Sequence, residues 1–461
     1  MWLEELIALI KKKQPSLLDG LDLKKVTINQ AQELINRAIE DSGERKKEGE
    51  GDMQRASQGM LNPRIGGGIG QRDKIQMALD LAMGLKPKDI TRLSKIRQLN
   101  GYPAFENMRA AQDYDVLRAV RIPSSIREFY VMLTGDGEMR GIFNRRGLPA
   151  DLRAAQDINS GTFSFLLGNS LGRRMVSDYL AVDYGENLLI SVRKPVKDFR
   201  AQEAVLVGYF PDLETVDPEA ADYNEIGGIT DEESSYVVGQ KGNILTITRK
   251  MIVNDDLSLI QRMGSRLGRA ARRSHAKYVW ALFITNSNCS DGTAWFTVGH
   301  GNLGAVALTH ANALAAYTAL ALMTENDSGE RLGLLADPNI KPTLVYPINL
   351  MSTGESIVTE EEYYTANDLT TKVKNPLRGK INGAQIPLAT DVDDWGLLLP
   401  PEIIDMVEMG YLNGREEPEM FLNDSPQGEQ VFMADKLRYK IRHEYAGTVI
   451  DHRSGYKSVV P

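Results

Sequence analysis

The sequence predicts an α+β fold, because three kinds of region follow one another along the chain. Helical patterns fill most of the first 180 residues, and residues 187–253 are rich in β-branched residues with partial alternation. A long helix is expected at residues 254–283, and mixed strand and helix signals continue from there. Strands and helices do not alternate as they would in a doubly wound sheet, so α+β is the better prediction.

The composition is that of an ordinary soluble globular protein with room for two or three domains. The chain has 461 residues, of which 42% are hydrophobic and 25% charged. Its net charge of −8 argues against a basic protein that coats nucleic acid, so any basic function must be local. Cys289 is the single cysteine, which excludes an internal disulfide and any CxxC metal or redox site.

Neither a membrane span nor a secretion signal is expected. No apolar run approaches the roughly 20 residues that a transmembrane helix needs. The first residues, MWLEELIALIKKKQ, place their lysines after the apolar stretch, which is the reverse of the order in a signal peptide. The sequence therefore predicts synthesis in an intracellular, soluble form.

The N-terminal region reads as charged helices followed by a linker. Residues 1–60 hold two helical stretches, and the second ends in a charged, glycine-containing tail. The stretch NPRIGGGIG at residues 62–70 has the glycines of a phosphate-binding loop. However, no Gly-Lys-Ser or Gly-Lys-Thr follows it, so we interpret it as a linker.

Three further helices are expected before the β-rich region. Residues 72–99 have a helical pattern that a proline interrupts. Residues 123–141 have Pro123 ahead of the helical pattern and Gly135 to stop it. Residues 162–180 repeat apolar side chains every four positions, which is a helical step.

The β-rich region predicts a long two-stranded arm with an irregular tip. Its strands are expected at residues 187–210 and 234–253, on either side of a segment rich in proline, glycine and acids. Residues 201–240 contain ten carboxylates and no lysine or arginine. This part of the arm, residues 201–240, is therefore acidic.

The helix expected at residues 254–283 presents three different sides when it is projected at about 100° per residue. Small residues, among them Gly264 and Gly268, occupy one side and suggest the close approach of another backbone. An apolar side is formed by Ile260, Met263, Leu267, Ala270, Ser274, Tyr278 and Ala281. A basic stripe, which lies in an adjacent arc, is formed by Arg262, Arg266, Arg269, Arg273 and Lys277.

Three interpretations of this basic stripe compete. It can be a solvated face, it can bind the phosphates of nucleic acid, or it can meet an acidic surface of another subunit. The acidic arm is a candidate partner, and contact between copies suits two segments that are consecutive in the sequence. The acidic residues that we expect at this subunit interface are Asp212, Glu214, Asp217, Glu219, Asp231, Glu232 and Glu233.

The remainder of the chain alternates loops with short elements. A glycine-rich loop is expected at residues 290–304 and an alanine-rich helix at 308–325. Residues 341–350 predict a strand, and residues 395–412 mix strand and helix signals. Residues 436–460 alternate in the manner of paired antiparallel strands.

No catalytic, metal-binding or cofactor-binding site emerges from the sequence. GNSLG at residues 168–172 matches the G-x-S-x-G nucleophile elbow with Ser170 at its centre, but its surroundings predict a continuous helix instead of a strand before the serine. The five histidines show no metal-ligand spacing, and His300 fits a turn. The three aspartates of DVDDW at residues 391–395 lack the spacing of a calcium loop.

ITRKMIVNDDL and DGTAWFTVGHGNL are the most specific parts of six phrases that, taken in order, resemble the major capsid (head) proteins of tailed bacteriophages, and most closely the Mu-like head subunit branch of the Hong Kong 97-type capsid fold. The resemblance covers about the last 340 residues. The phrases that carry it are SIREFYVMLTGD (125–136), FLLGNSLGRRMVSDY (165–179), VKDFRAQEAVLVGYFPDLETV (196–216), GNILTITRKMIVNDDLSLIQRMGSRLGRAA (242–271), SDGTAWFTVGHGNLG (290–304) and RHEYAGTVIDHRSGYKS (442–458).

This resemblance implies a peripheral domain with a long spine helix, an axial domain and an extended β-hairpin loop that lies over a neighbouring subunit. A helical N-terminal extension, scaffold-like or a propeptide, would precede them. The expected segments are 1–122 for the extension, 123–196 for the N-terminal arm and helices, 197–250 for the extended loop, 251–289 for the spine helix, 290–430 mainly for the axial domain and 431–461 for the last peripheral strands.

The function that the resemblance implies is structural and not enzymatic. Subunits would assemble as pentamers and hexamers into an icosahedral head around double-stranded phage DNA, which they would touch weakly and without sequence specificity. A portal, a scaffold and a maturation protease are expected partners, with no membrane and no cofactor. The protein would be made in the cytoplasm of the bacterial host and end in the virion. Two alternatives are an encapsulin-like nanocompartment shell protein and, from another class, a serine hydrolase that uses Ser170.

Overall fold

The computed structural model describes nine stretches of the chain, all within the second of two compact units, residues 69–461. These stretches are residues 71–85, 123–139, 143–148, 162–207, 231–254, 257–325, 329–365, 368–423 and 436–461. The helices expected within residues 1–60 and the linker at 62–70 lie outside the described residues.

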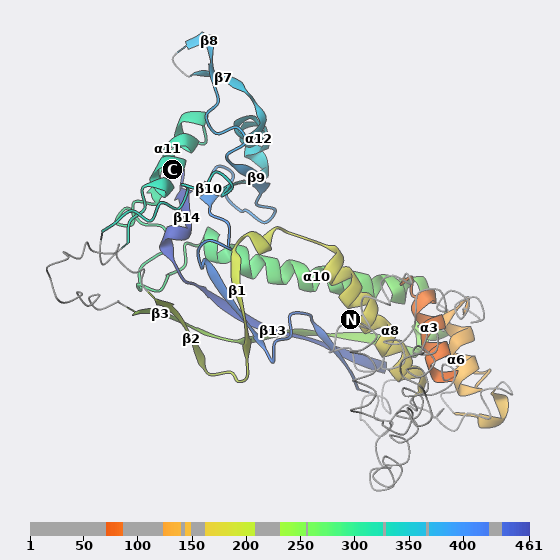
Figure 1. Cartoon of the computed structure of the whole chain (residues 1–461). Coiled ribbons are helices and arrows are strands. Elements are labelled where there is room, and N and C mark those ends of the chain that lie inside the picture. Colours follow the sequence, from red (N-terminus) through yellow and green to blue (C-terminus); the bar gives the residue numbers. More distant parts are fainter. Residues whose placement is uncertain are drawn as a thin grey trace, which may run out of the picture. The chain divides into compact units, whose positions relative to one another are not determined.

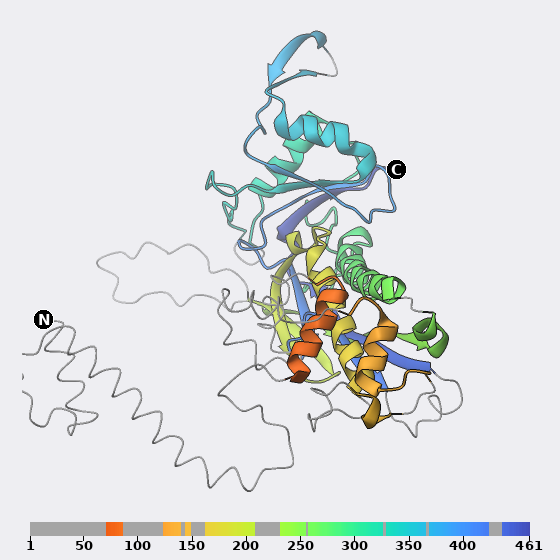
Figure 2. The ribbon, with the colours of Figure 1, turned by 90° about the vertical axis from the view of Figure 1, so that its right-hand side faces the viewer.

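Three helices from the N-terminal part of the described chain pack together (Figures 1 and 2). They are α3 (Gln71–Ala82), α6 (Ile126–Thr134) and α8 (Thr162–Ala181), and both α3 and α6 contact α8. The Ser125 side chain caps α6 by accepting a hydrogen bond from the Glu128 backbone N–H. Gly135 ends α6 in the left-handed conformation with φ of 67°, as the sequence predicts.

The first of two five-stranded sheets is centred on one long strand, β13 (Lys436–Val449). One edge of β13 pairs with β4 (Gly239–Thr248) along ten residues. The other edge pairs with β12 (Glu419–Asn423) and then with β11 (Val407–Leu412), which in turn pairs in parallel with β1 (Ile190–Val196). Because β4 and β1 belong to this sheet, they are not strands of the predicted arm.

The second sheet has the order β5-β14-β10-β6-β9 and draws on distant parts of the sequence. Its strands are β5 (Leu303–Gly304), β6 (Thr343–Tyr346), β9 (Asn382–Gln385), β10 (Trp395–Leu398) and β14 (Gly455–Ser458). The prediction that residues 436–460 form strands paired with each other is wrong. β13 and β14 belong to different sheets, and the short 3-10 helix His452–Ser454 connects them.

The two-stranded arm is shorter than the sequence predicts. β2 (Ala201–Val207) pairs antiparallel with β3 (Asp231–Val237), and these two strands form a sheet of their own. We call this pair the β2–β3 ribbon. The predicted irregular tip falls in residues 208–230, outside the described part of the chain.

The remaining elements are short. α9 (Arg249–Val253) begins after Thr248, whose side chain accepts a hydrogen bond from the Met251 backbone N–H. α11 (His310–Ala321) and α12 (Met351–Thr359) flank strands of the second sheet, and β7 (Glu362–Thr365) pairs with β8 (Asp368–Lys374). In the described ranges, no helix combines the length and the apolar character needed to cross a bilayer.

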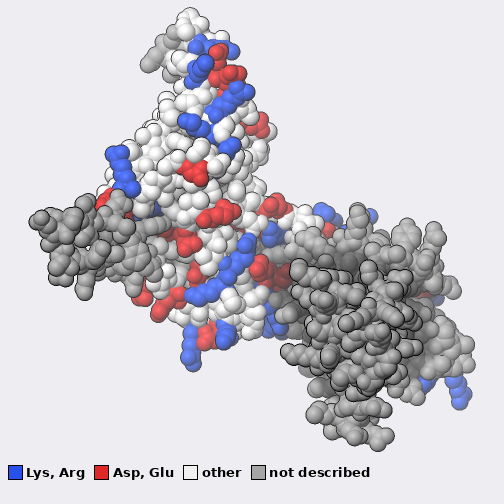
Figure 3. Space-filling view, in the orientation of Figure 1, with Lys and Arg blue, Asp and Glu red and all other residues white. Residues whose placement is uncertain are grey.

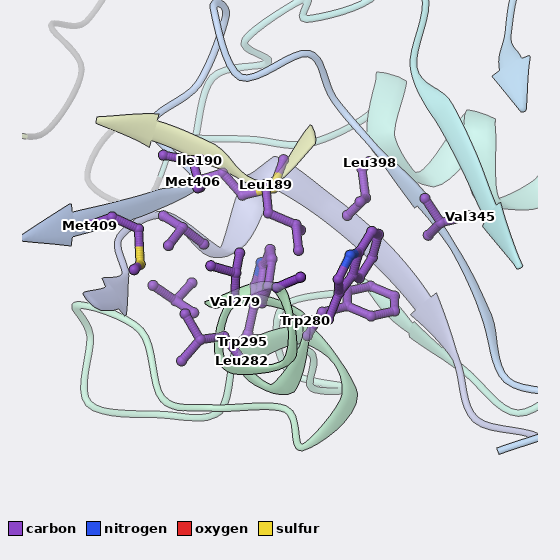
Figure 4. Packing of buried hydrophobic residues seen from close by; sticks show 14 of the residues in the cluster. Leu189, Ile190, Val279, Trp280, Leu282, Trp295, Val345, Leu398, Met406 and Met409 are labelled. Carbon is purple, nitrogen blue, oxygen red and sulfur yellow. The ribbon is translucent and has the colours of Figure 1, made fainter. Parts of the chain in front are cut away.

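The long helix predicted at residues 254–283 is α10 (Leu257–Ile284). Its C-terminal half anchors the central hydrophobic core. There Val279, Trp280 and Leu282 meet Leu189 and Met406, the residues just before β1 and β11 (Figure 4). These side chains are almost wholly removed from water, so burial of apolar surface holds the helix against the first sheet. The mixture of helices with mainly antiparallel sheets confirms the α+β class and is consistent with a Hong Kong 97-type fold.

Candidate assembly surface

The basic stripe of α10 is exposed along its whole length. Arg262, Arg266, Arg273 and Lys277 are all exposed and have no carboxylate of the described residues within 4.0 Å. Arg269 is also exposed, and its nearest carboxylate oxygen, on Asp178, is 3.8 Å away. Exposed ion pairs of this kind contribute little to stability, about 0–1 kcal/mol. The stripe is therefore available to an external partner.

The face of α10 opposite the stripe is buried, and this corrects the predicted apolar side. Gly264, Gly268, His275 and Val279 are buried, whereas most of the predicted apolar residues are only half-buried and Ser274 is exposed. The two glycines allow α8 to approach closely: a Cβ built on Gly268 would lie 2.1 Å from the carbonyl oxygen of Met175. The predicted close approach of another backbone is thus confirmed, and it defines the core face.

The inner face of the β2–β3 ribbon is fixed to the same subunit. Tyr236 is buried, and its hydroxyl donates a 2.8 Å hydrogen bond to the Glu408 carboxylate of β11. Ser234 hydrogen-bonds Thr448 of β13, and Glu232 accepts a 3.0 Å hydrogen bond from the Ser290 hydroxyl. The position of the ribbon against the first sheet is therefore set by polar contacts as well as by the buried Ala204.

The outer face of the ribbon carries carboxylates together with apolar side chains. Glu203 and Glu233 are exposed, and Val205 and Val237 are 53% and 57% exposed. Val205 is directly opposite Glu233 in the strand register, so acidic and apolar groups alternate over one surface. We call this surface, made of Ala201, Glu203, Val205, Glu233, Ser235 and Val237, the outer ribbon face.

The predicted acidic interface residues therefore divide into three groups. Glu233 lies on the outer ribbon face, but Glu232 is partly buried and bonded to Ser290 of its own subunit. The side chain of Asp231 and all of Asp212, Glu214, Asp217 and Glu219 lie outside the described residues. Glu203, which the sequence did not single out for the interface, adds a carboxylate to the outer ribbon face.

A buried polar network that the sequence did not reveal fixes α10 to the first sheet. The Glu186 carboxylate is buried and lies 2.9 Å from the Arg272 guanidinium and 3.5 Å from Nδ1 of His275. Burial raises the pKa of Glu186, but the nearby His275 ring and the charge of Arg272 outweigh it and lower that pKa. On its other side, His275 shares a 2.9 Å hydrogen bond with the Tyr411 hydroxyl of β11.

His443 stacks beside His275 in this network. Because it is buried, we expect the free energy of unfolding to depend on pH. Burial first, and then the neighbouring His275, lower the pKa of His443 from 6.5 to about 3. The unfolded chain therefore binds one more proton between these two pH values. Lowering the pH from about 6.5 should reduce the free energy of unfolding by about 1.4 kcal/mol per pH unit through this residue, until the loss levels off near pH 3.

The variant His443→Gln isolates this contribution, because a glutamine amide can still donate to the Glu416 carbonyl oxygen that His443 contacts at 3.0 Å. Urea unfolding of unassembled subunits at several pH values should give a shallower pH dependence for the variant. Equal slopes for the two proteins would show that His443 is not the responsible group.

Ser170 lies in the middle of α8 and is fully buried, so it does not stand on a strand-to-helix elbow. Its hydroxyl donates to the Asp80 carboxylate and accepts a 2.7 Å hydrogen bond from the Gln76 side chain, both from α3. Asp80 also pairs with Arg173 at 2.8 Å. The serine thus belongs to a buried polar contact between α3 and α8 and not to a hydrolase site.

Charges of both signs are interspersed over the described surface visible in Figure 3. Acidic and basic residues meet near the β7–β8 hairpin, where Arg378 pairs with Glu361 at 2.8 Å. Among the described residues, potential metal ligands converge at two places, Cys289 with Asp291 and His452, and the exposed or partly exposed Asp391, Asp393 and Asp394. The first group joins residues that are far apart in the sequence, so ligand spacing could not indicate it.

One family model matches the chain. Residues 231–458 match the family model described as phage capsid protein. Comparison with curated proteins found no significant match.

Solved structures with a similar chain include a procapsid, a capsid and a structure of a mycobacteriophage. The procapsid of bacteriophage JBD30 is 15% identical over 66% of this chain and 77% of that chain, with a TM-score of 0.36. The capsid of an empty GTA particle is 9% identical over 60% and 90%, with a TM-score of 0.38. Mycobacterium phage Patience is 10% identical over 64% and 87%, with a TM-score of 0.40.

The family match begins at β3 and ends at β14. It therefore contains one strand of the ribbon, all of α10 with its basic stripe, and both five-stranded sheets except β1. The chain belongs to the phage capsid protein family, and it is a structural subunit of a phage head.

Proposed function

We propose that the head assembles by contact between the outer ribbon face of one subunit and the basic stripe of α10 in the next. The outer ribbon face offers Glu203 and Glu233, and the stripe offers cations that have little or no pairing with the described residues of their own subunit. Opposite charges on two surfaces of one chain give a head-to-tail contact, which fixes register and speeds association. The exposure of these two oppositely charged surfaces is the observation that carries the proposal.

Apolar contact would supply the part of the interface energy that salt does not screen. Val205 and Val237 project from the outer ribbon face, and Phe199 just before the ribbon is 51% exposed. Apolar side chains grouped on one exposed surface are typical of a protein interaction site. Many such contacts act together in a closed shell, so each of them can be weak while the particle is stable.

We also propose the finer features of the assembly that the resemblance implies. The shell is icosahedral, built of pentamers and hexamers of a Mu-like subunit, and encloses double-stranded DNA that it touches weakly. The net charge of −8 supports weak contact, because a container that bound DNA tightly would impede packaging and release. A portal, a scaffold and a maturation protease complete the assembly in the host cytoplasm, and residues 1–122 act as a scaffold-like or removable extension.

We also propose the roles of the segments that the resemblance implies. Residues 123–196 act as N-terminal arm and helices, and residues 197–250 as the extended loop, whose outer ribbon face meets the next subunit while β4 stays in the first sheet of its own subunit. Residues 251–289 and 431–461 supply the spine helix and last strands of a peripheral domain, and residues 290–430 are mainly axial. Support comes from the β2–β3 ribbon, with its exposed outer face, and from the unbroken helix α10.

A charge swap tests the ribbon–stripe contact. The double variant Arg266→Glu with Arg273→Glu should reduce the fraction of subunits in shells at least about tenfold, because like charges would then face each other. The double variant Glu203→Lys with Glu233→Lys should have the same effect. The chain that carries all four changes should recover assembly, measured by gradient sedimentation and negative-stain microscopy.

Two controls separate this contact from its alternatives. Arg266→Lys with Arg273→Lys keeps the charge and should assemble normally. If the arginine reversal yields normal shells that package less DNA, the stripe contacts nucleic acid and the proposal fails. A four-fold variant that assembles no better than either double variant would also refute the contact.

A further inference from the structure

Two segments that are far apart in the sequence bring together three side chains that can each bind a metal ion through a different kind of atom. Cys289 and Asp291 lie in the loop after α10, and His452 lies in the 3-10 helix between β13 and β14. One atom of each of these side chains, a sulfur, a carboxylate oxygen and a ring nitrogen, lies within 4.8 Å of the other two. The Cys289 thiol donates a 3.0 Å hydrogen bond to Oδ1 of Asp291.

His452 has the properties of a ligand whose hydrogen-bonding capacity is not satisfied by the protein. Its side chain is only 5% exposed, and its Nδ1 is buried with no hydrogen-bond partner within the described ranges. The closest carboxylate oxygen to Nδ1, on Asp451, is 4.0 Å away, which is too far for a hydrogen bond. A buried polar atom left without a partner costs about 1–3 kcal/mol, so such atoms usually have a specific reason.

The imidazole of His452 is held in one orientation by a neighbouring aromatic ring. The His300 ring stacks on it with a centroid distance of 3.9 Å and an angle of 16° between the planes. This stacking fixes the orientation of the ring before any ion binds.

The carboxylate of Asp291 is held in place by its neighbours. It accepts hydrogen bonds from the Thr293 backbone N–H at 2.8 Å, from the Thr293 hydroxyl at 2.9 Å, and shares one of 2.7 Å with Nε2 of His300. Partners of this kind orient a metal-binding carboxylate, and their loss typically weakens metal affinity about 10–100-fold.

We propose that Cys289, Asp291 and His452 form a binding site for a divalent transition-metal ion of the zinc type. Sulfur, nitrogen and carboxylate oxygen are the donors that zinc prefers, whereas calcium and magnesium take oxygen donors. Binding displaces the thiol proton of Cys289, so the thiolate and the Asp291 carboxylate both face the cation. Three protein ligands leave the fourth tetrahedral position to water.

This site lies where two segments of the chain lead into the second sheet. The loop that carries Cys289 and Asp291 leads from α10 to β5 of the second sheet. His452 stands where the chain passes from β13 of the first sheet to β14 of the second. A bound ion therefore ties together two of the places where the chain passes between the sheets, which goes beyond the ribbon–stripe contact and does not depend on it.

Binding of Zn²⁺ and Co²⁺ to the full-length chain tests the proposal. After removal of metal with a chelator, the protein should bind one equivalent of Zn²⁺, measured by elemental analysis after dialysis. Co²⁺ should give a thiolate-to-metal charge-transfer band, and Cys289 is the only thiol that can produce it. Cys289→Ser should abolish the band and weaken Zn²⁺ binding more than about 100-fold, and Thr293→Val should weaken it about 10–100-fold.

Two variants control for other sites. His310→Gln changes a histidine that stacks on Tyr363 in another region, and Asp393→Asn changes the other acidic group; both should bind Zn²⁺ as the unmodified chain does. The proposal is overturned if the unmodified chain gives no charge-transfer band with Co²⁺. It is also overturned if Cys289→Ser keeps full Zn²⁺ affinity, or if Asp393→Asn removes the binding.

Discussion

Replacing Asp80 with alanine should lower the free energy of unfolding by about 3–5 kcal/mol. Asp80 is fully buried between α3 and α8, where it pairs with the buried Arg173 and accepts hydrogen bonds from Gln76 and Ser170. Removing one member of a buried ion pair leaves the other charge without that compensation, which accounts for the size of the loss. Urea unfolding of dilute, unassembled subunits gives the measurement.

Two further variants of this contact should form a graded series. Asp80→Asn keeps a hydrogen-bonding side chain but removes the charge, so its loss should be intermediate. Ser170→Ala removes one buried hydroxyl and should cost about 1–3 kcal/mol. This serine variant should also leave shell assembly intact, and the unmodified protein should show no esterase activity. If Asp80→Ala unfolds within about 1 kcal/mol of the parent, the pairing of α3 with α8 described above is incorrect.

Replacing Gly268 with alanine should also destabilise the subunit strongly, by about 2–3 kcal/mol. The new Cβ would lie 2.1 Å from the Met175 carbonyl oxygen and 3.1 Å from the Tyr179 backbone nitrogen, both in α8. Backbone atoms cannot move aside as a flexible side chain can, so the two helices would have to separate. Overpacking of this kind costs typically about 1–3 kcal/mol and outweighs the better helix propensity of alanine.

Gly264 of the same helix provides the matched control. A Cβ at this position would meet its nearest neighbours, in Arg174 and Leu171, at 3.4 Å, which is ordinary contact. Gly264→Ala should therefore be neutral or should stabilise the subunit by up to about 1 kcal/mol. Equal losses for the two variants in urea unfolding would contradict the close approach of α8 at Gly268.

Sequence patterns within one segment were sufficient to predict α8, the end of α6 and the exposure of the basic stripe. The four-residue step in residues 162–180 predicted α8, and Gly135 ends α6 as expected. The exposure of the basic stripe also followed from the sequence, because five cations on one side of a helix cannot be buried without partners.

The core face of α10 was not assigned correctly because it depends on another helix. Gly264 and Gly268 carry no apolar side chain, so a pattern of hydrophobic residues assigns the core to the wrong side. Only the approach of α8, 90 or so residues earlier in the chain, gives these glycines their role. The basic stripe consequently lies opposite the core and not beside it.

Contacts between distant segments explain the other differences. β13 and β14 alternate as paired strands would, but each finds its partners in another part of the chain. In the sequence, nothing distinguishes Glu232 from the other acids of the arm. In the structure it accepts a hydrogen bond from Ser290, 58 residues later. Similarly, nothing in the sequence near Cys289 indicates that His452 lies beside it. Such pairings depend on the tertiary fold, which a single sequence does not specify by local pattern.

The central conclusion is that the chain is a structural subunit of a phage head. The mass of the purified protein tests this conclusion most directly. Size-exclusion chromatography with light scattering, followed by negative-stain microscopy, should reveal closed shells or capsomers of very high mass. The proportion of shells should change with protein concentration and salt, because charge contributes to the contacts. A monomer that persists across a wide range of concentration and salt would contradict the account.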